Sequence, residues 1–136
     1  MSLPTFATFE STEPDDTIWS EGGDVKHPGG KSIAERLASS LKDTVGPVGG
    51  CDQHSFYGWH FSAGDYWCLL QQSGPWLLIV EDRTPLLRRV LASERRAFKS
   101  FLEAVNLALA KDRSISSIQW HTRAEYERQG RPIPKS

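Results

Sequence analysis

Three short apolar segments separated by tight turns constrain the fold of this chain more than any other feature of its sequence. The segments span residues 56–61, 66–72 and 76–81, and the spacers between them, 62–65 and 73–75, consist mainly of Ser, Gly, Asp and Pro. Spacers this short can join only antiparallel neighbours in a sheet. The sequence therefore predicts a three-stranded antiparallel meander over residues 55–81.

The pleat of this meander sorts its side chains onto two faces. We expect Phe61 to pair with Tyr66 across the first turn and Gln72 to pair with Trp76 across the second, with successive residues alternating between faces. The face expected to form the core carries Tyr57, Trp59, Phe61, Tyr66, Cys68, Leu70, Trp76, Leu78 and Val80. The other face is too apolar for open solvent and carries Phe56, Gly58, His60, Trp67, Leu69, Gln71, Leu77, Ile79 and Glu81.

Two longer segments outside the meander have the periodicity of amphipathic helices. Ser32 and Glu35 have the spacing of a capping box and Gly46 provides a stop, so we expect a helix over residues 32–45. Residues 94–111, with Ser93 as the N-cap, predict a second helix that carries its apolar residues on one side. That apolar stripe consists of Phe98, Phe101, Leu102, Val105 and Leu109.

Shorter elements complete the predicted architecture. A helical turn begun by Thr84 and a short strand around 118–120 precede a brief helix ending at Gln129, where Thr122 and Glu125 repeat the capping-box spacing. Together the elements predict an α+β two-layer sandwich, with the helices packed on one antiparallel sheet. We expect residues 1–30 to form an acidic arm with edge strands near 5–9 and 17–20, and residues 31–136 to form a single α+β domain.

The order of elements over residues 31–120, a helix, three antiparallel strands and a helix, resembles that of dimeric type III secretion chaperones and of small bacterial toxin-immunity proteins. The resemblance implies a protein-binding module. The long N-terminal arm and the lack of strong acidity depart from the chaperone pattern. Similarity in element order does not by itself define a function.

Charge is distributed unevenly along the chain, although the net charge is only −1. Residues 1–24 hold six acidic residues and no Lys or Arg, whereas the remainder holds 16 basic and 11 acidic residues. Arms with few apolar anchors usually stay mobile. We therefore expect a solvated acidic leader rather than an arm folded back over a basic body.

Composition indicates a globular chain, with 38% hydrophobic and 24% charged residues. The longest apolar run, 76–80, is far shorter than the roughly 20 residues of a membrane span, and no signal-peptide pattern opens the sequence. Cys51 and Cys68 are too few for a disulfide framework. We expect a cytoplasmic protein with no membrane contact and no cofactor.

A compact polar cluster follows the Gly49-Gly50 bend. Cys51, Asp52, His54 and Tyr57, with His60 nearby, are the candidates for an alternative pocket in a small-molecule enzyme or ligand binder. A nucleophilic Cys51 would require a lowered thiol pKa and an orienting group. No second pair with zinc-ligand spacing accompanies this cluster, so no metal site is expected.

Two further segments invite a phosphate-binding interpretation. Gly29-Gly30-Lys31-Ser32 lacks the first glycine of a phosphate loop, because Val25 stands at that position, and is expected to be the entry to a helix. Residues 83–99 contain six Lys or Arg and one acid, Glu94. Nucleic-acid binding through this Arg88–Lys99 surface remains an alternative, although a pI near 6.4 is not typical of such modules.

The chain offers aromatic surface but no complete catalytic motif, so we assign no catalytic residue and expect a non-catalytic cytosolic protein-binding module. Its partner is expected to be another protein or a second copy of the chain, with nucleic acid and membrane disfavoured. The expected binding residues on the less apolar sheet face are Phe56, His60, Trp67, Leu69 and Ile79. The equally weighted alternative is that a helix or the N-terminal arm covers this face, which then forms a second core layer.

Overall fold

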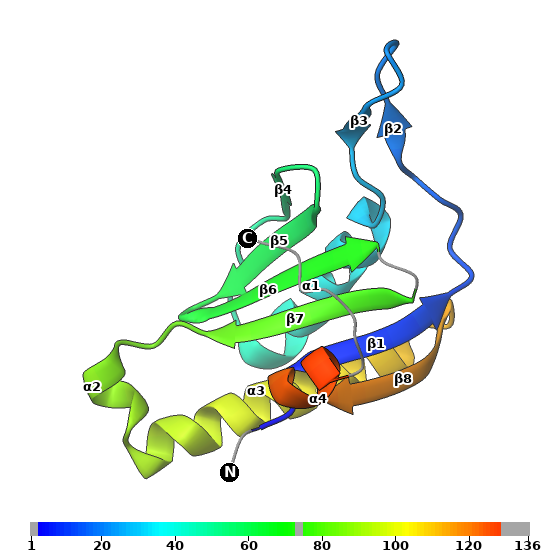
Figure 1. Ribbon diagram of the computed structural model, residues 1–136. Coiled ribbons are helices and arrows are strands. Elements are labelled where there is room, and N and C mark those ends of the chain that lie inside the picture. The colour runs from blue at the N-terminus through cyan, green and yellow to red at the C-terminus, as the bar shows by residue number, and fades with distance from the viewer. Residues whose placement is uncertain (1–2, 73–74, 129–136) are drawn as a thin grey trace.

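A six-stranded antiparallel sheet is the centre of the structure (Figure 1). The computed structural model describes residues 3–72 and 75–128, so the turn at Ser73-Gly74 and the predicted helix end at Gln129 lie outside it. The order of the strands is β4-β5-β6-β7-β1-β8. Their bounds are β1 Phe6–Ser11, β4 Asp52–His54, β5 Gly58–Ala63, β6 Tyr66–Gln72, β7 Trp76–Asp82 and β8 Ile115–His121, and a separate hairpin joins β2 Ile18–Trp19 to β3 Val25–His27.

Two long helices cover one face of this sheet, and a short helix lies on the other. Helices α1 (Lys31–Val45) and α3 (Ala92–Lys111) pack against each other and enclose the main core, whereas α4 (Arg123–Arg128) packs on the opposite side (Figure 1). The short α2 (Leu86–Arg89) projects beyond the sheet between β7 and α3. The predicted α+β fold is confirmed. Within the described residues, no helix combines the length and apolar character that crossing a membrane would demand.

The register of the meander is partly as predicted. Gln72 pairs with Trp76 as expected, but Phe61 pairs with Cys68 and Tyr66 pairs with Ala63, so the first hairpin is two residues away from the predicted register. A shift of two preserves the faces because side chains alternate with a period of two. Trp59, Phe61, Cys68, Leu70, Leu78 and Val80 therefore still face α1 and α3 and form the core.

The N-terminal segment is built into the sheet rather than appended to it. β1 lies between β7 and β8, so the expected edge strand near residues 5–9 is an interior strand. Ala7 and Phe9 face the helices and are fully buried. The expectation of a solvated leader is wrong for this segment, because its apolar residues find partners more than sixty residues away in the sequence.

The acidic residues after β1 hold the start of α1. One carboxylate oxygen of Asp16 accepts the Gly30 backbone N–H at 2.7 Å, and the other accepts that of Ser32 at 3.1 Å. Asp16 thus replaces the predicted Ser32–Glu35 capping box, which does not form: α1 has Gly30 as its N-cap. The Ser32 hydroxyl instead donates to Glu13, which also pairs with Arg36 at 3.1 Å.

Of the three remaining predicted caps, one forms and two do not. Thr122 and Glu125 form the expected reciprocal capping box, in which each backbone N–H donates to the side chain of the other residue. Ser93 is not a cap, because α3 begins one residue earlier, at Ala92. Thr84 is not a cap either, because Pro85 takes that position before α2.

Replacing Asp16 by Ala should lower the free energy of unfolding by about 1–2 kcal/mol, because two backbone donors lose a charged acceptor. Urea denaturation would measure the change. Glu21→Ala, at an exposed position in the β2–β3 turn, is the matched control and should stay within about 0.5 kcal/mol of the parent chain. Equal stability of the two variants would contradict the role assigned to Asp16.

Candidate binding site on the second sheet face

We call the side of the sheet opposite α1 and α3 the second sheet face. Helix α4 covers the part of this face formed by β1, β7 and β8, where Tyr126 packs on Phe6 with ring centroids 5.3 Å apart and Leu77 completes the cluster. His121 lies beside them and exchanges a buried 3.1 Å hydrogen bond with the Thr8 hydroxyl. This part of the face is a second, smaller core.

The part formed by β4, β5 and β6 carries a cluster of aromatic and imidazole rings. The Trp67 indole N–H donates to His60 Nδ1 at 3.2 Å, and His54 stands edge-on to both, with ring centroids 5.5 Å from each. The Arg83 guanidinium lies 4.1 Å from the centre of the Trp67 ring, which is a cation–π contact. We call His54, His60, Trp67 and Arg83 the ring cluster.

Two exposed aromatic side chains extend beyond the ring cluster at the β4–β5 turn. Phe56 is 68% exposed and Tyr57 is 45% exposed. The turn is well defined: Ser55 adopts a left-handed φ of 51°, and the Tyr57 N–H donates to the His54 carbonyl at 3.1 Å. Tyr57, expected on the core face of a strand, therefore precedes β5 and stands in this turn.

The five predicted binding residues therefore do not form one continuous solvent-exposed surface. His60 and Trp67 touch each other in the ring cluster, and Phe56 stands two residues from His54 in the adjoining turn. Trp67 and Leu69 are only 6% and 1% exposed, however, so they lie beneath the surface. Ile79 packs against the small core under α4.

The alternative pocket does not assemble. Asp52 and His54 lie on the second sheet face, whereas Cys51 packs against the main core on the other side. Burial raises the pKa of the Cys51 thiol to about 11, with Glu35 and Asp52 adding negative charge, so the thiolate needed by a nucleophile is disfavoured. Cys68 is fully buried and its thiol pKa is raised even further.

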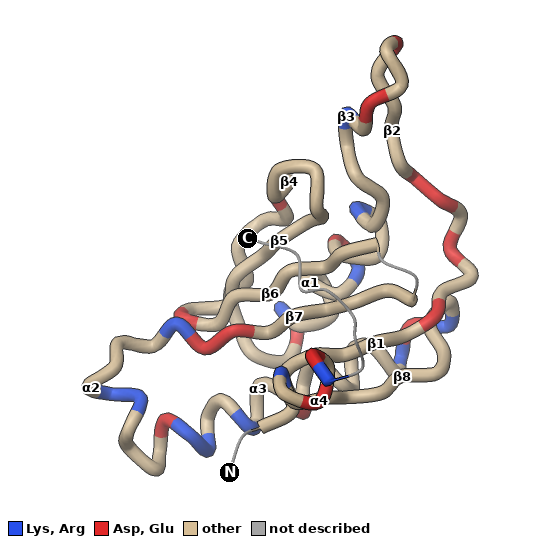
Figure 2. Tube along the Cα trace, in the orientation of Figure 1, with Lys and Arg blue, Asp and Glu red and all other residues tan. Residues whose placement is uncertain are grey.

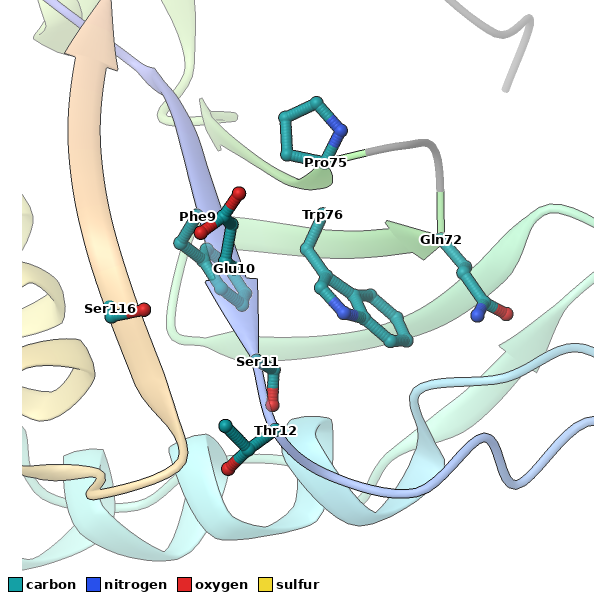
Figure 3. Close-up of a pocket in the computed structure, with 8 residues that line it drawn as sticks. All are labelled: Phe9, Glu10, Ser11, Thr12, Gln72, Pro75, Trp76 and Ser116. Atoms are coloured by element: carbon teal, nitrogen blue, oxygen red, sulfur yellow. The ribbon is translucent and has the colours of Figure 1, made fainter.

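Figure 3 shows a pocket of about 580 Å³ that uses other residues. It opens where β1 and β6 end and β7 begins, beside β8, and combines the Trp76 and Phe9 rings with the Glu10 carboxylate. None of the predicted site residues lines it. Among the described residues, no three His, Cys, Asp or Glu side chains come close enough to bind a metal ion.

The phosphate-loop interpretation is also resolved by geometry. The backbone amides of Gly30 and Ser32, which would receive an anion, are already bonded to the Asp16 carboxylate. Gly30 has a φ of 106°, and a Cβ there would lie 2.9 Å from the Trp76 ring. Gly30 therefore lets the loop pack closely on Trp76 of β7, which explains this glycine without a ligand.

Sequence reasoning missed two members of the ring cluster. Arg83 was grouped with the basic segment, and His54 was grouped with Cys51 rather than with Trp67. A signal for Arg83 exists, because it follows Glu81 by two residues and Glu81 belongs to the same face as Trp67. Arg83 also pairs with Glu81 at 3.1 Å, which holds the guanidinium in position.

The ring cluster disfavours protonation of His54. Partial burial lowers its pKa, and the nearby positive charges of His60 and Arg83 lower it further. Asp52, which pairs across the strands with His60, and Glu81 are the acidic residues of this region. The imidazole of His54 is therefore neutral at pH 7, and it contacts its neighbours as an aromatic ring rather than as a cation.

Acidification should destabilise the protein through His54. Between its lowered folded pKa and the ordinary value of 6.5, the unfolded chain binds more protons than the folded chain, so the free energy of unfolding falls as pH is lowered through this window. Thermal unfolding of the parent chain and of His54→Asn, measured from about pH 7.5 to 5, would reveal this. The variant should lose less stability on acidification; parallel pH profiles would contradict the assignment.

Comparison of the chain with protein-family models, with curated proteins and with solved structures found no match.

Proposed function

We propose that this chain is a non-catalytic protein-binding module that engages its partner through the Phe56–Tyr57 turn and the adjoining ring cluster. The single observation that supports this most is the pair of large aromatic side chains exposed on the short turn between β4 and β5. We further propose a cytosolic location, which suits the two free thiols.

The physical basis of the proposal is that aromatic rings bury a large area on binding at a small cost in conformational entropy. Phe and Tyr bury a large area when they enter a partner's pocket, and they lose little conformational entropy because each has only two side-chain torsions. The turn is held by Gln53, whose side-chain amide donates to the Ser55 carbonyl at 2.8 Å. A rigid turn adds affinity because less ordering is required on binding.

The ring cluster supplies a polar border beside these aromatic residues. His54 and His60 are half-buried, and the Arg83 guanidinium is exposed above Trp67. A buried apolar centre bordered by polar, hydrogen-bonding groups is the usual composition of a protein interface. The deeply buried Trp67 would support this surface from below rather than contact the partner.

The two alternative functions have less support. The raised pKa of Cys51 and its separation from His54 by the sheet weaken the enzyme or ligand-binding hypothesis. The basic surface proposed for nucleic acid is partly engaged, because Arg88 pairs with Asp65 at 2.9 Å and Arg89 donates to the Thr84 carbonyl at 2.8 Å.

The double variant Phe56→Ala/Tyr57→Ala should weaken partner binding about 30-fold or more, the loss typical of aromatic hot spots. Affinity capture with the parent chain, followed by titration of the retained partner, would measure it. Leu107→Ala, at a similarly exposed position on α3, is the control and should bind as the parent does.

Both substitutions lie at exposed positions, so melting temperatures should not change, and a loss of binding cannot be assigned to unfolding. If the partner is a second copy, light scattering of the parent chain will detect it, and the double variant will be monomeric. A partner that binds the double variant as tightly as the parent would refute the proposal.

A further inference from the structure

The segment from α2 to the start of α3 exposes four aliphatic side chains, and the two arginines among them are also solvent-exposed but bond back to the molecule. Two of these aliphatic residues lie in α2, and two lie between α2 and α3. Arg88 and Arg89, between them, turn back toward the body of the molecule. The exposed aliphatic residues are Leu86 (71%), Leu87 (89%), Val90 (78%) and Leu91 (51%), and we call them the aliphatic knob.

Two solvent-exposed arginines connect this segment to the rest of the molecule. Arg88 donates to the Asp65 carboxylate at 2.9 Å, and Arg89 donates twice to the Thr84 carbonyl, at 2.8 and 3.1 Å. The base of the segment is also anchored, because the Arg83 N–H donates to the Asp65 carbonyl at 2.8 Å and Thr84 is buried. The knob is therefore held outward by bonds at its base, and does not simply lie on a loose loop.

Basic residues outnumber acidic residues around the knob. Residues 83–99 carry six Lys or Arg and only Glu94 as an acid, although Arg83 and Arg88 pair with Glu81 and Asp65, and Figure 2 shows charges of both signs at this end of the molecule. Arg95, Arg96 and Lys99 line a hollow of about 390 Å³ in the first turns of α3. The acidic residues of the segment 10–24 lie at the other end, along β1 and the β2–β3 hairpin.

Shape and charge together narrow the choice of partner. A second copy offers the acidic β2–β3 hairpin, but this ribbon is itself a projection, and two projections bury little area. The carboxylates of Glu13 and Asp16 in that copy already bind α1. A second hollow, lined by Leu102 and Trp120 among others, could also receive the knob of another copy. It contains Lys99, which also lines the hollow in the first turns of α3, and this positive charge would repel the basic residues around that knob.

We propose that the aliphatic knob docks on a membrane surface that contains anionic lipids. Its side chains enter the boundary between headgroups and acyl chains, while Arg96 and Lys99 lie near lipid phosphates. The acidic end of the chain then points away from the negative surface, which orients the molecule. No membrane contact was expected from the sequence, because its apolar runs are too short for a membrane-spanning segment. Among the described residues no helix could span a membrane, but a segment that lies on the membrane surface does not need one.

This docking is independent of the proposed protein-binding surface. The Phe56–Tyr57 turn joins β4 and β5, whereas the knob lies between β7 and α3. An experiment can therefore refute the membrane-docking proposal without refuting the protein-binding proposal, and the reverse.

Co-sedimentation with vesicles tests the proposal, using phosphatidylcholine alone and phosphatidylcholine mixed with phosphatidylserine. The parent chain should bind only the mixed vesicles, and binding should weaken when salt rises from about 0.05 to 0.5 M. Leu87→Asp should lower the partition coefficient about tenfold or more. Arg96→Gln/Lys99→Gln should lower it about fivefold for each charge removed.

Leu107→Asp, which adds the same charge at an exposed position on α3, is the control and should lose much less binding. Equal loss in the two Asp variants, equal binding to both kinds of vesicle, or no vesicle binding at all would overturn the proposal. Self-association, or binding of an acidic protein, that Leu87→Asp abolishes in the absence of vesicle binding would identify the knob as a protein interface instead.

Discussion

The packing of α1 and α3 on one face of the sheet is the constraint on which the rest of the structure depends. Strands β5, β6 and β7 carry apolar side chains on both faces, but the long helices enclose only the face that contains Trp59, Leu70 and Leu78. The second sheet face must therefore be covered by other means. Helix α4 covers it at β1 and β7, and the ring cluster covers it at β5 and β6.

Local patterns predicted those parts of the fold that depend on neighbours in the sequence. The period of two gave the correct faces for Trp59 and Leu78 even though the first hairpin is displaced by two residues. A displacement of two residues leaves every side chain on the same face of the sheet. The capping box at Thr122 was correct because both of its partners lie within one turn. Helix periodicity likewise placed α1 and α3 within two residues of their observed bounds.

Features set by distant partners were not predictable in this way. The position of β1 inside the sheet depends on pairing with β7 and β8, and composition alone made its segment resemble a solvated arm. The cap of α1 comes from Asp16, which precedes the helix by a whole hairpin, so the local Ser32–Glu35 pattern was misleading. Of the candidate site, His60 and Trp67 were paired correctly by face, but the burial of Trp67 depends on Arg83 and His54, which were assigned elsewhere.

The two surfaces on which our proposals rest are held in a similar way by hydrogen bonds. At the β4–β5 turn, Gln53 bonds the carbonyl of Ser55 and leaves Phe56 outward; at α2, Arg88 and Arg89 bond the body and leave the leucines outward. In each case polar groups that could bond to water bond to the protein instead. These bonds hold a segment whose apolar side chains remain in contact with water, which is unfavourable. Exposed apolar side chains held in this way are the feature from which both proposed contacts are argued.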